Sequence, residues 1–199
     1  DTSNLLLKYL ISEESLNNLD SQWPIVLFGP SGTGKTSLAL TIVSDLTDQS
    51  KQADEVIPIR KSKIEPSLGR PMFLSALEFD RRYRSAIETD SVDDFRNKLV
   101  QSAGVIIDDV DRLENKTAAQ AELVRVLEQM SDKNRPIVVT MPTSPQFCNG
   151  LSSRLISRLS LGLSLPVNPP GPEARLEIIR QLSNINQINL ADDASQLLA

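Results

Sequence analysis

Short apolar runs alternate with helical patterns along the chain. Runs rich in strand-forming residues predict buried strands at 25–28, 72–74, 105–107, 137–140 and 161–167. Elsewhere apolar residues recur every three or four positions, which predicts helices at 5–19, 38–46, 75–88, 92–99, 117–131 and from 172 onward. Strands that alternate with helices predict an α/β fold, in which a parallel five-stranded sheet lies between helices.

Several helix ends and connections have their own sequence signals. Ser75 with Glu78 forms a capping-box pattern, and Ser91 with Asp94 is a weaker copy of it. Residues 51–71 carry three prolines, a glycine and five basic residues, which predicts a loop or a short hairpin insertion.

A Pro-rich connection at 168–172 marks the predicted domain boundary. We expect residues 1–167 to form an αβα core and residues 168–199 to begin a small helical domain. The apolar pattern of residues 189–199 predicts a further helix that is cut at Ala199, and a naturally frayed terminus is the alternative.

The composition excludes several kinds of chemistry. The 199 residues include no histidine, which removes Ser-His-Asp and Cys-His catalysis and any metal site that needs an imidazole. The one cysteine, Cys148, has no internal disulfide partner, which fits a cytoplasmic location, and we expect its role to be structural or incidental. No apolar run has the roughly 18 residues of a membrane-spanning helix. The formal net charge of −5 gives no overall attraction to nucleic acid, so any DNA contact must be local.

A phosphate-binding motif follows the first predicted strand. The pattern G-x-x-x-x-G-K-[ST] is matched by Gly29, Pro30, Ser31, Gly32, Thr33, Gly34, Lys35 and Thr36. Glycines let the backbone amides approach phosphate oxygens, and the following helix N-terminus adds to the attraction. Lys35 would face the β- and γ-phosphates, and the Thr36 hydroxyl would bind Mg²⁺. Because the motif lies between a strand and a helix, it predicts ATP or ADP binding.

Two carboxylates end the third predicted strand. Asp108 and Asp109 follow it directly, and ligands of parallel sheets lie beyond the carboxyl ends of the strands. We expect Asp108 to reach Mg²⁺ near Thr36, through a water molecule, and Asp109 to polarise an attacking water. The alternative is that both are solvated loop residues or helix caps. A nucleotide kinase needs no second acid here, whereas a hydrolysing switch does.

The order of these motifs resembles that of AAA+ ATPases, and specifically the replication initiator family DnaA. Residues 151–163, LSSRLISRLSLGL, are similar to the family's L-x-x-R-L-x-S-R-F-x-x-G-L box. Residues 169–179 are similar to the stretch that follows it, and 107–113 to the family's acidic strand. Asn4 stands where the family has an asparagine near the adenine pocket.

The resemblance implies an AAA+ P-loop NTPase with a small helical lid, which switches between ATP and ADP states and oligomerises on origin DNA. It makes Arg158 the arginine finger that reaches the γ-phosphate of a neighbouring subunit, so the isolated chain should be at most a weak ATPase. It leaves Thr140, at the end of the sensor strand, as a polar contact for the nucleotide. From the residues alone, Arg154 and Arg158 are equally consistent with surface helix arginines.

The sequence also departs from the family pattern. Pro142 replaces the usual sensor aspartate, and Ala118 and Ala119 replace the arginine and threonine associated with single-stranded DNA. The chain stops before the second-sensor arginine and before a helix-turn-helix domain. Three alternatives therefore stay open: a helicase loader or transposition helper of the same superfamily, a P-loop nucleotide kinase, and an adaptor that has lost hydrolysis.

A cluster of basic residues lies in the helix predicted at 75–88. Its members, which could meet DNA phosphates, are Arg81, Arg82 and Arg84. Glu78, Asp80 and Glu88 lie in the same helix, and we favour a solvated face in which these acids balance the arginines. These three arginines and Lys116 are the remaining basic residues that could contact DNA, so we expect weak DNA binding.

Overall fold

A single parallel sheet forms the centre of the molecule. The computed structural model describes residues 23–47 and 70–188. Its strands are β1 (Ile25–Phe28), β2 (Met72–Ser75), β3 (Val105–Asp108), β4 (Ile137–Met141) and β5 (Leu163–Pro166). All the strand pairs are parallel, in the order β2-β3-β4-β1-β5. The predicted α/β class and the parallel five-stranded sheet are confirmed.

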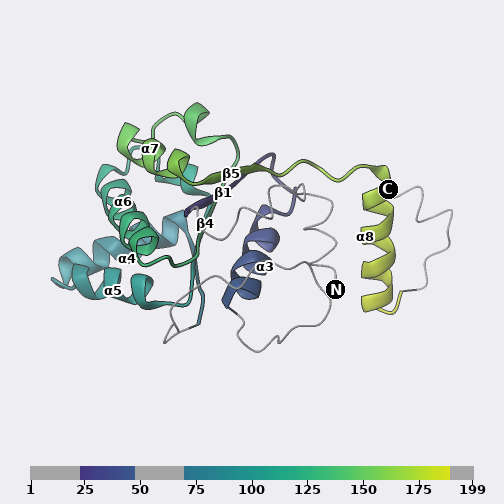
Figure 1. Cartoon of the computed structure of the whole chain (residues 1–199), viewed down its shortest axis with the longest axis horizontal. Helices are drawn as coiled ribbons and strands as arrows, with labels where there is room; N and C mark the ends of the chain where they lie inside the picture. Colours follow the sequence, from purple (N-terminus) through teal and green to yellow (C-terminus); the bar gives the residue numbers. More distant parts are fainter. Residues whose placement is uncertain (1–22, 48–69, 189–199) are drawn as a thin grey trace.

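The helices divide between the two faces of this sheet (Figure 1). Helix α3 (Lys35–Thr47) packs on one face, against β1, β3 and β4. The other face carries α4 (Ala76–Glu88), α5 (Val92–Gln101), α6 (Thr117–Asp132) and α7 (Ser153–Leu161). Helix α6 contacts each of the other three. Two short 3₁₀ helices, η1 (Val110–Leu113) and η2 (Pro145–Phe147), follow β3 and β4.

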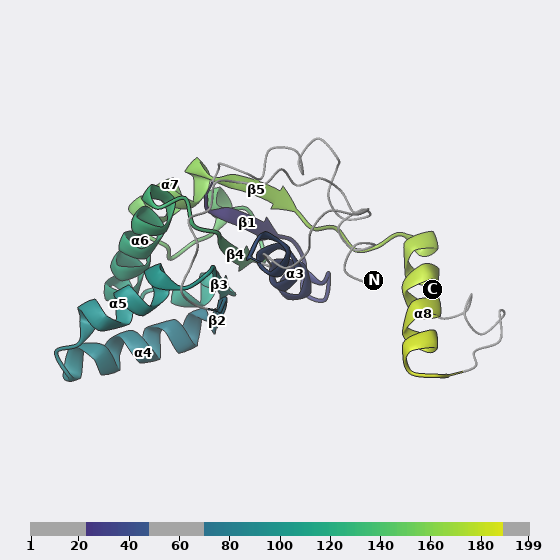
Figure 2. The same cartoon turned by 60° about the horizontal axis from the view of Figure 1, so that its bottom comes forward.

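Helix α8 (Pro172–Ile185) stands apart from this core. Figure 2 shows it beyond an extended segment that leaves β5, on the far side of α3 from α4–α7. Pro172 occupies its first turn, where the missing amide hydrogen costs nothing. This arrangement fits a boundary in the Pro-rich connection.

The core is formed by the strands and by the inward faces of the helices. Ile25, Val26 and Leu27 of β1 are fully buried, and so are the α3 residues that cover them, Leu38, Ala39, Ile42 and Val43. β1 lies in the interior of the sheet, so both its faces are covered, which is why its sequence is continuously apolar rather than alternating. Burial of each such aliphatic side chain contributes about 1.5–3 kcal/mol.

The two predicted capping boxes have different outcomes. Ser75 caps α4 as expected, because its Oγ accepts the Glu78 amide hydrogen at 3.2 Å. The Glu78 carboxylate pairs with Arg81 and Arg82 on the next turn. The prediction for Ser91 is wrong in this respect: α5 begins after it, but its side chain makes no capping bond, and its Oγ lies 2.7 Å from Thr89 Oγ1 instead.

The fifth strand begins later than its apolar pattern predicted. Leu161 is the last residue of α7, and β5 begins at Leu163. The helix persists because Ser152 caps it and Leu155 and Leu159 bury its inner face. It ends at Gly162, where a Cβ would lie 1.8 Å from the Pro24 carbonyl oxygen. Apolar residues in both the helix and the strand made the boundary invisible in the sequence.

Three sequence expectations fall outside the described residues. They are the helix at 5–19, nearly all of the insertion at 51–71, and the helix at 189–199. None of the described helices combines the length and the apolar character needed to cross a membrane.

Candidate functional site

The phosphate-binding motif forms the turn between β1 and α3. Gly32 and Gly34 have φ angles of 82° and 87°, and apart from each glycine and its two chain neighbours, no atom of the described residues lies within 4 Å of the position a Cβ would take. These two residues therefore combine a left-handed backbone with open space on the side where a ligand would approach. Such a loop before a helix N-terminus can receive phosphate groups.

Lys35 is folded back onto this loop. Its ammonium group donates to the carbonyl oxygens of Gly29, at 2.8 Å, and of Pro30, at 2.7 Å, and the side chain is nearly buried. The Thr33 hydroxyl also donates to the Pro30 carbonyl, at 3.0 Å. Both acceptors of Lys35 are neutral, so a phosphate oxygen would be a stronger partner for the ammonium group than either.

Three polar side chains from three elements meet beside the loop. The Thr36 hydroxyl, at the start of α3, lies 2.9 and 3.1 Å from the two carboxylate oxygens of Asp108, at the end of β3. The buried Thr140 hydroxyl, on β4, donates to Asp108 Oδ1 at 2.6 Å. The register pairs Ile107 with Val139, so the residues that follow them come together at the carboxyl edge of the sheet.

This donor set fits a magnesium ion. Mg²⁺ takes oxygen ligands and keeps several waters, so it usually needs one or two protein oxygens besides phosphate. Thr36 and Asp108 provide a hydroxyl and a carboxylate within hydrogen-bonding distance of each other, as the sequence predicted for this pair. Among the described residues, there is no group of three or more His, Cys, Asp or Glu residues that could hold a metal ion.

Asp109 points away from this group. Its backbone is left-handed, with φ 55° and ψ 56°, and its amide donates to Thr140 Oγ1 at 2.9 Å. Its carboxylate is about half exposed and pairs with Arg112, whose Nε lies 3.3 Å away. The role of Asp109 in activating water stays a prediction.

Sequence reasoning missed Asp111. Its Oδ1 is buried without a hydrogen-bond partner among the described residues. Burial raises the pKa of the carboxyl above its usual range, the Asp109 charge raises it further, and Arg112 and Lys35 oppose the shift. The only sequence signal was its place as the third acid in four positions after a buried strand.

Sequence reasoning also missed Gln120, a buried residue of α6. Its Nε2 donates to the carbonyls of Leu113, at 2.8 Å, and Gly150, at 2.9 Å. Its Oε1 accepts the amide hydrogen of Ser152, the cap of α7, at 2.6 Å. One amide side chain thus joins the turn that follows Asp108 to the helix that carries Arg158.

Arg158 lies on the surface of α7, and it takes no part in the hydrogen bonds of the phosphate loop. It pairs with Glu128 of α6 at 2.8 Å, and Arg154 reaches the same carboxylate at 3.3 Å. The Arg158 side chain is 43% exposed. Its guanidinium is therefore accessible to a neighbouring molecule, as a finger acting in trans requires, and it is also a surface helix arginine.

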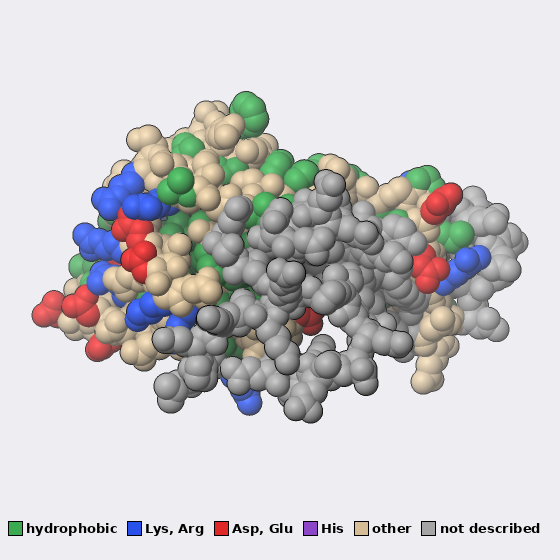
Figure 3. Space-filling model, in the orientation of Figure 1, with side chains coloured by type: hydrophobic (Ala, Val, Ile, Leu, Met, Phe, Trp, Pro, Cys, Tyr) green, Lys and Arg blue, Asp and Glu red, His purple; other side chains and the backbone are tan. Residues whose placement is uncertain are grey.

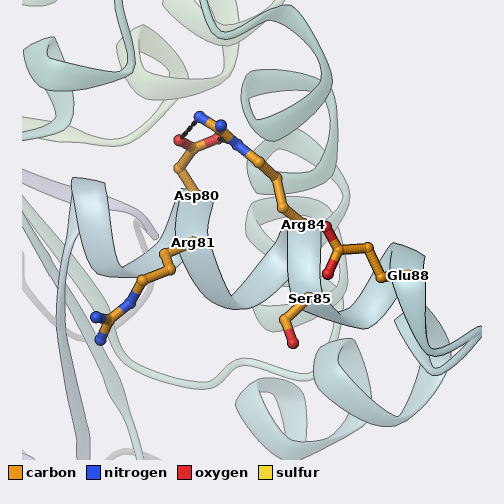
Figure 4. A pocket seen from close by; sticks show the side chains of 5 residues that line it. All are labelled: Asp80, Arg81, Arg84, Ser85 and Glu88. Atoms are coloured by element: carbon orange, nitrogen blue, oxygen red, sulfur yellow. Dashed lines mark hydrogen bonds and ion pairs between the residues drawn. The ribbon is translucent and has the colours of Figure 1, made fainter.

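The arginines of α4 are paired within their own helix. Arg81 and Arg82 pair with Glu78, and Arg84 pairs with Asp80, which Lys116 also approaches at 3.7 Å. Figure 4 shows a hollow beside α4, in which Arg84 turns to Asp80 while Arg81 points the other way. Figure 3 shows blue and red side chains interleaved over this part of the surface. Of the three acids that the sequence predicted to balance the arginines, Glu78 and Asp80 form these ion pairs, and no such pair with Glu88 is found among the described residues.

The lone cysteine has the features of an unreactive thiol. Burial raises the pKa of Cys148, and the charges of Asp111 and Glu114 raise it further. The side chain therefore stays protonated at neutral pH, and the thiol rather than the nucleophilic thiolate is present. This agrees with the structural or incidental role expected from the sequence, since neither needs a reactive thiolate.

Asn4 lies outside the described residues, so its expected place near an adenine ring is untested. The other predicted site residues divide into two groups. The loop at 29–36, Asp108 and Thr140 form one connected site, whereas Asp109 is at its margin and Arg158 lies on another surface.

Comparisons with known proteins agree with these features. The family model described as the bacterial DnaA ATPase domain matches residues 7–166. The chromosomal replication initiator protein DnaA of Kosmotoga olearia is 28% identical over 192 residues, which are 96% of this chain and 39% of that protein. The chain thus spans about two fifths of the length of this relative.

Solved structures show the same fold. Domain III of the Thermotoga maritima replication initiation protein DnaA superposes with a TM-score of 0.78 at 22% identity, and covers 99% of this chain and 80% of that one. A replication initiator DnaA bound to AMPPCP and single-stranded DNA superposes with a TM-score of 0.74 at 21% identity, over 97% of this chain and 58% of that one.

Proposed function

Because this chain belongs to the bacterial DnaA ATPase domain family, we propose that it is the nucleotide-dependent switch of a replication initiator. In this proposal it binds ATP or ADP with Mg²⁺, hydrolyses ATP slowly and self-associates on origin DNA when ATP is bound. In this proposal it acts in the cytoplasm, because its DNA partner would be the chromosome. The helicase-loader, transposition-helper and kinase alternatives are not favoured, since the family model covers most of the chain.

The observation that carries nucleotide binding is the connection of the phosphate loop to Asp108 through Thr36. The loop amides and Lys35 would hold the phosphates, and Thr36 and Asp108 would hold Mg²⁺. A magnesium ion held there would neutralise negative charge on the phosphates. A related initiator has been seen bound to the ATP analogue AMPPCP, which supports the assignment of an adenine nucleotide. Asn4 would contribute to the adenine pocket.

Slow hydrolysis follows from the state of the catalytic candidates. Asp109 would polarise the attacking water, but its carboxylate is paired with Arg112 at the margin of the site. Arg158 would complete the site only in a neighbouring subunit, after release from Glu128. The loss of an arginine finger costs about 10³–10⁵ in rate in related chemistry. The isolated chain is therefore a weak ATPase that assembly activates.

The proposed division into domains follows the course of the chain. Residues 1–167 form the nucleotide-binding core, and residues 168–199 begin a helical lid, of which α8 is the first helix. The distance of α8 from α4–α7 in Figure 2 supports this division.

DNA binding by this chain alone is expected to be weak. To bind DNA phosphates, the arginines of α4 would have to give up their ion pairs with Glu78 and Asp80. The loss of these pairs offsets much of the free energy gained from the phosphate contacts. A relative has been seen with single-stranded DNA, so assembly of several copies along a strand is the route that we propose for tighter binding.

The test of nucleotide binding is a calorimetric titration of the chain with ATP and ADP in the presence of Mg²⁺. Lys35→Ala should weaken binding at least tenfold, about 1.4 kcal/mol, because the phosphates lose their principal charge partner. Lys98→Ala is the matched control, since Lys98 is an exposed residue of α5 on the other side of the sheet. Equal affinities of Lys35→Ala and the parent chain would contradict the proposal.

A further inference from the structure

We propose that Thr140 is a positioning residue, which fixes the Asp108 carboxylate and the backbone of Asp109 and makes no direct contact with the nucleotide. The inference rests on the proposed function and differs from the sequence expectation, in which Thr140 was a polar contact for the nucleotide. It depends on the hydrogen bonds of a single hydroxyl group.

The Thr140 hydroxyl has its one proton committed. A hydroxyl group offers one donor and two acceptor sites. Thr140 Oγ1 donates to Asp108 Oδ1 at 2.6 Å, a length typical of a strong hydrogen bond to a charged acceptor. A phosphate oxygen can only accept a hydrogen bond. It could therefore bind Thr140 only if the hydroxyl stopped donating to Asp108. Thr140 is also fully buried within β4.

The acceptor side of the same oxygen holds Asp109. The Asp109 amide donates to Thr140 Oγ1 at 2.9 Å. The left-handed backbone at Asp109 is disfavoured for a residue with a Cβ, so it persists only where its surroundings hold it. This turn sends the Asp109 carboxylate toward Arg112 while Asp108 remains directed at Thr36. Thr140 thus sets the different directions of the two acids.

Thr36 cannot replace Thr140 in this role. Both hydroxyls bond to Asp108 Oδ1, Thr36 at 2.9 Å and Thr140 at 2.6 Å. Thr36 and Asp108 are the two groups proposed to turn their oxygens toward Mg²⁺. Thr140 is the described donor that would continue to orient the carboxylate in that state. Its effect on nucleotide affinity should therefore depend on magnesium.

The experiment measures ATP affinity by calorimetry in Mg²⁺ and, separately, in EDTA. Thr140→Val keeps the shape of the side chain and removes both hydrogen bonds. We expect it to weaken binding at least tenfold in Mg²⁺ and less than threefold in EDTA. Thr140→Ser, which restores the hydroxyl, should bind within threefold of the parent chain in both conditions.

A second readout needs no nucleotide. Hydrogen exchange of the Asp109 amide, followed by NMR, should be at least tenfold faster in Thr140→Val and restored in Thr140→Ser. Ser102→Ala is the matched control, since Ser102 is also buried and donates to the carbonyls of Leu99 and Gly104 at the opposite end of β3. It should alter neither exchange at Asp109 nor the magnesium dependence of binding. Thr140→Ala makes the same test if the valine variant does not fold.

Two results would overturn the inference. One is an equal loss of affinity with and without Mg²⁺ in Thr140→Val, which would make Thr140 a direct nucleotide contact. The other is unchanged exchange at Asp109. If the parent chain binds no nucleotide, the proposed function fails, and the exchange experiment still decides whether Thr140 holds Asp109.

Discussion

At the scale of single residues, three acids within four positions have three different environments. Asp108 accepts hydrogen bonds from two hydroxyl groups, Asp109 forms an ion pair at the surface, and Asp111 has a buried oxygen with no partner among the described residues. Their sequence positions are almost equivalent, and the turn that begins with the left-handed Asp109 separates them. The chemistry available to each carboxylate follows from its neighbours rather than from its type.

Asp111 should make the protein less stable as pH rises. Its pKa is raised in the folded state, so between the ordinary carboxyl pKa and the raised one the folded chain holds more proton than the unfolded chain, and stability falls with increasing pH. Asp111→Asn should increase the free energy of unfolding at pH 7, because the folded chain no longer holds an ionised carboxylate at a buried position.

Urea unfolding at pH 7 and pH 3 checks this prediction. At pH 3 the carboxyl is protonated in both states, so the advantage of the asparagine should largely disappear. A gain of equal size at both pH values would mean that the shape of the side chain, and not its charge, decides its contribution.

At the scale of elements, hydrogen bonds between helices hold the face that carries α4–α7. Glu122 of α6 is fully buried and receives Arg96 of α5, whose Nη2 lies 2.9 Å from Glu122 Oε2. Gln120, two residues earlier, binds the turn after β3 and the cap of α7. α6 is therefore the element that fixes the positions of its neighbours, and apolar periodicity alone did not reveal this.

Arg96→Ala should destabilise the fold by about 3 kcal/mol, because removing one member of a buried pair leaves the other charge without compensation. Arg125 approaches Glu122 only to 3.4 Å and is largely exposed, so it offsets little of this loss. Arg81→Ala, which removes an exposed pair with Glu78, should cost less than about 1 kcal/mol and is the control. Thermal and urea unfolding measure both, and similar costs would contradict the assignment.

At the scale of the whole molecule, the phosphate loop and Arg158 belong to different surfaces. The loop opens at the carboxyl edge of the sheet, between β1 and α3, and Arg158 lies on α7 beside α6. In the proposed assembly, one chain would supply the phosphate loop of one ATPase site and the Arg158 finger of another. A second copy must bring its Arg158 surface to the loop of the first before the proposed ATPase site is complete.

ATP hydrolysis should therefore rise more steeply than linearly with protein concentration. Arg158→Ala should abolish the increase and leave ATP affinity within about threefold of the parent chain, because its own loop is intact. Mixing Arg158→Ala with Lys35→Ala chains should restore part of the activity, since each supplies what the other lacks. Steady-state phosphate release across a range of concentrations measures these effects.

Arg125→Ala is the control for this experiment, because Arg125 is an exposed α6 arginine that pairs with a different carboxylate, Glu122. A turnover that is independent of concentration and above about 1 s⁻¹ would instead fit a self-sufficient phosphotransfer enzyme, for which 1–100 s⁻¹ is typical.

The sequence by itself determined the α/β class, all five strands and the phosphate loop. These features depend on local patterns: apolar runs bounded by turns, helical periodicity, and a motif whose residues are contiguous. Local information also placed Ser75 as a cap and Asp108 near Thr36, since parallel strands end at one edge. Local information failed at Leu161, because the helix and the strand that meet there are both apolar. It also failed at Ser91, whose hydroxyl bonds to Thr89 instead of capping α5.

Only the tertiary structure decided which side chains share hydrogen bonds across elements. The commitment of the Thr140 hydroxyl to Asp108 depends on the register of β3 against β4, and 32 residues separate the two in the chain. The packing of helices and turns likewise decides three other features. These are the pairing of Arg158 with Glu128, the hydrogen bonds of Gln120 to neighbouring elements, and the unpartnered oxygen of Asp111. A hydrogen bond requires an approach of about 3 Å, and sequence patterns specify the faces of elements but not distances between atoms of different elements.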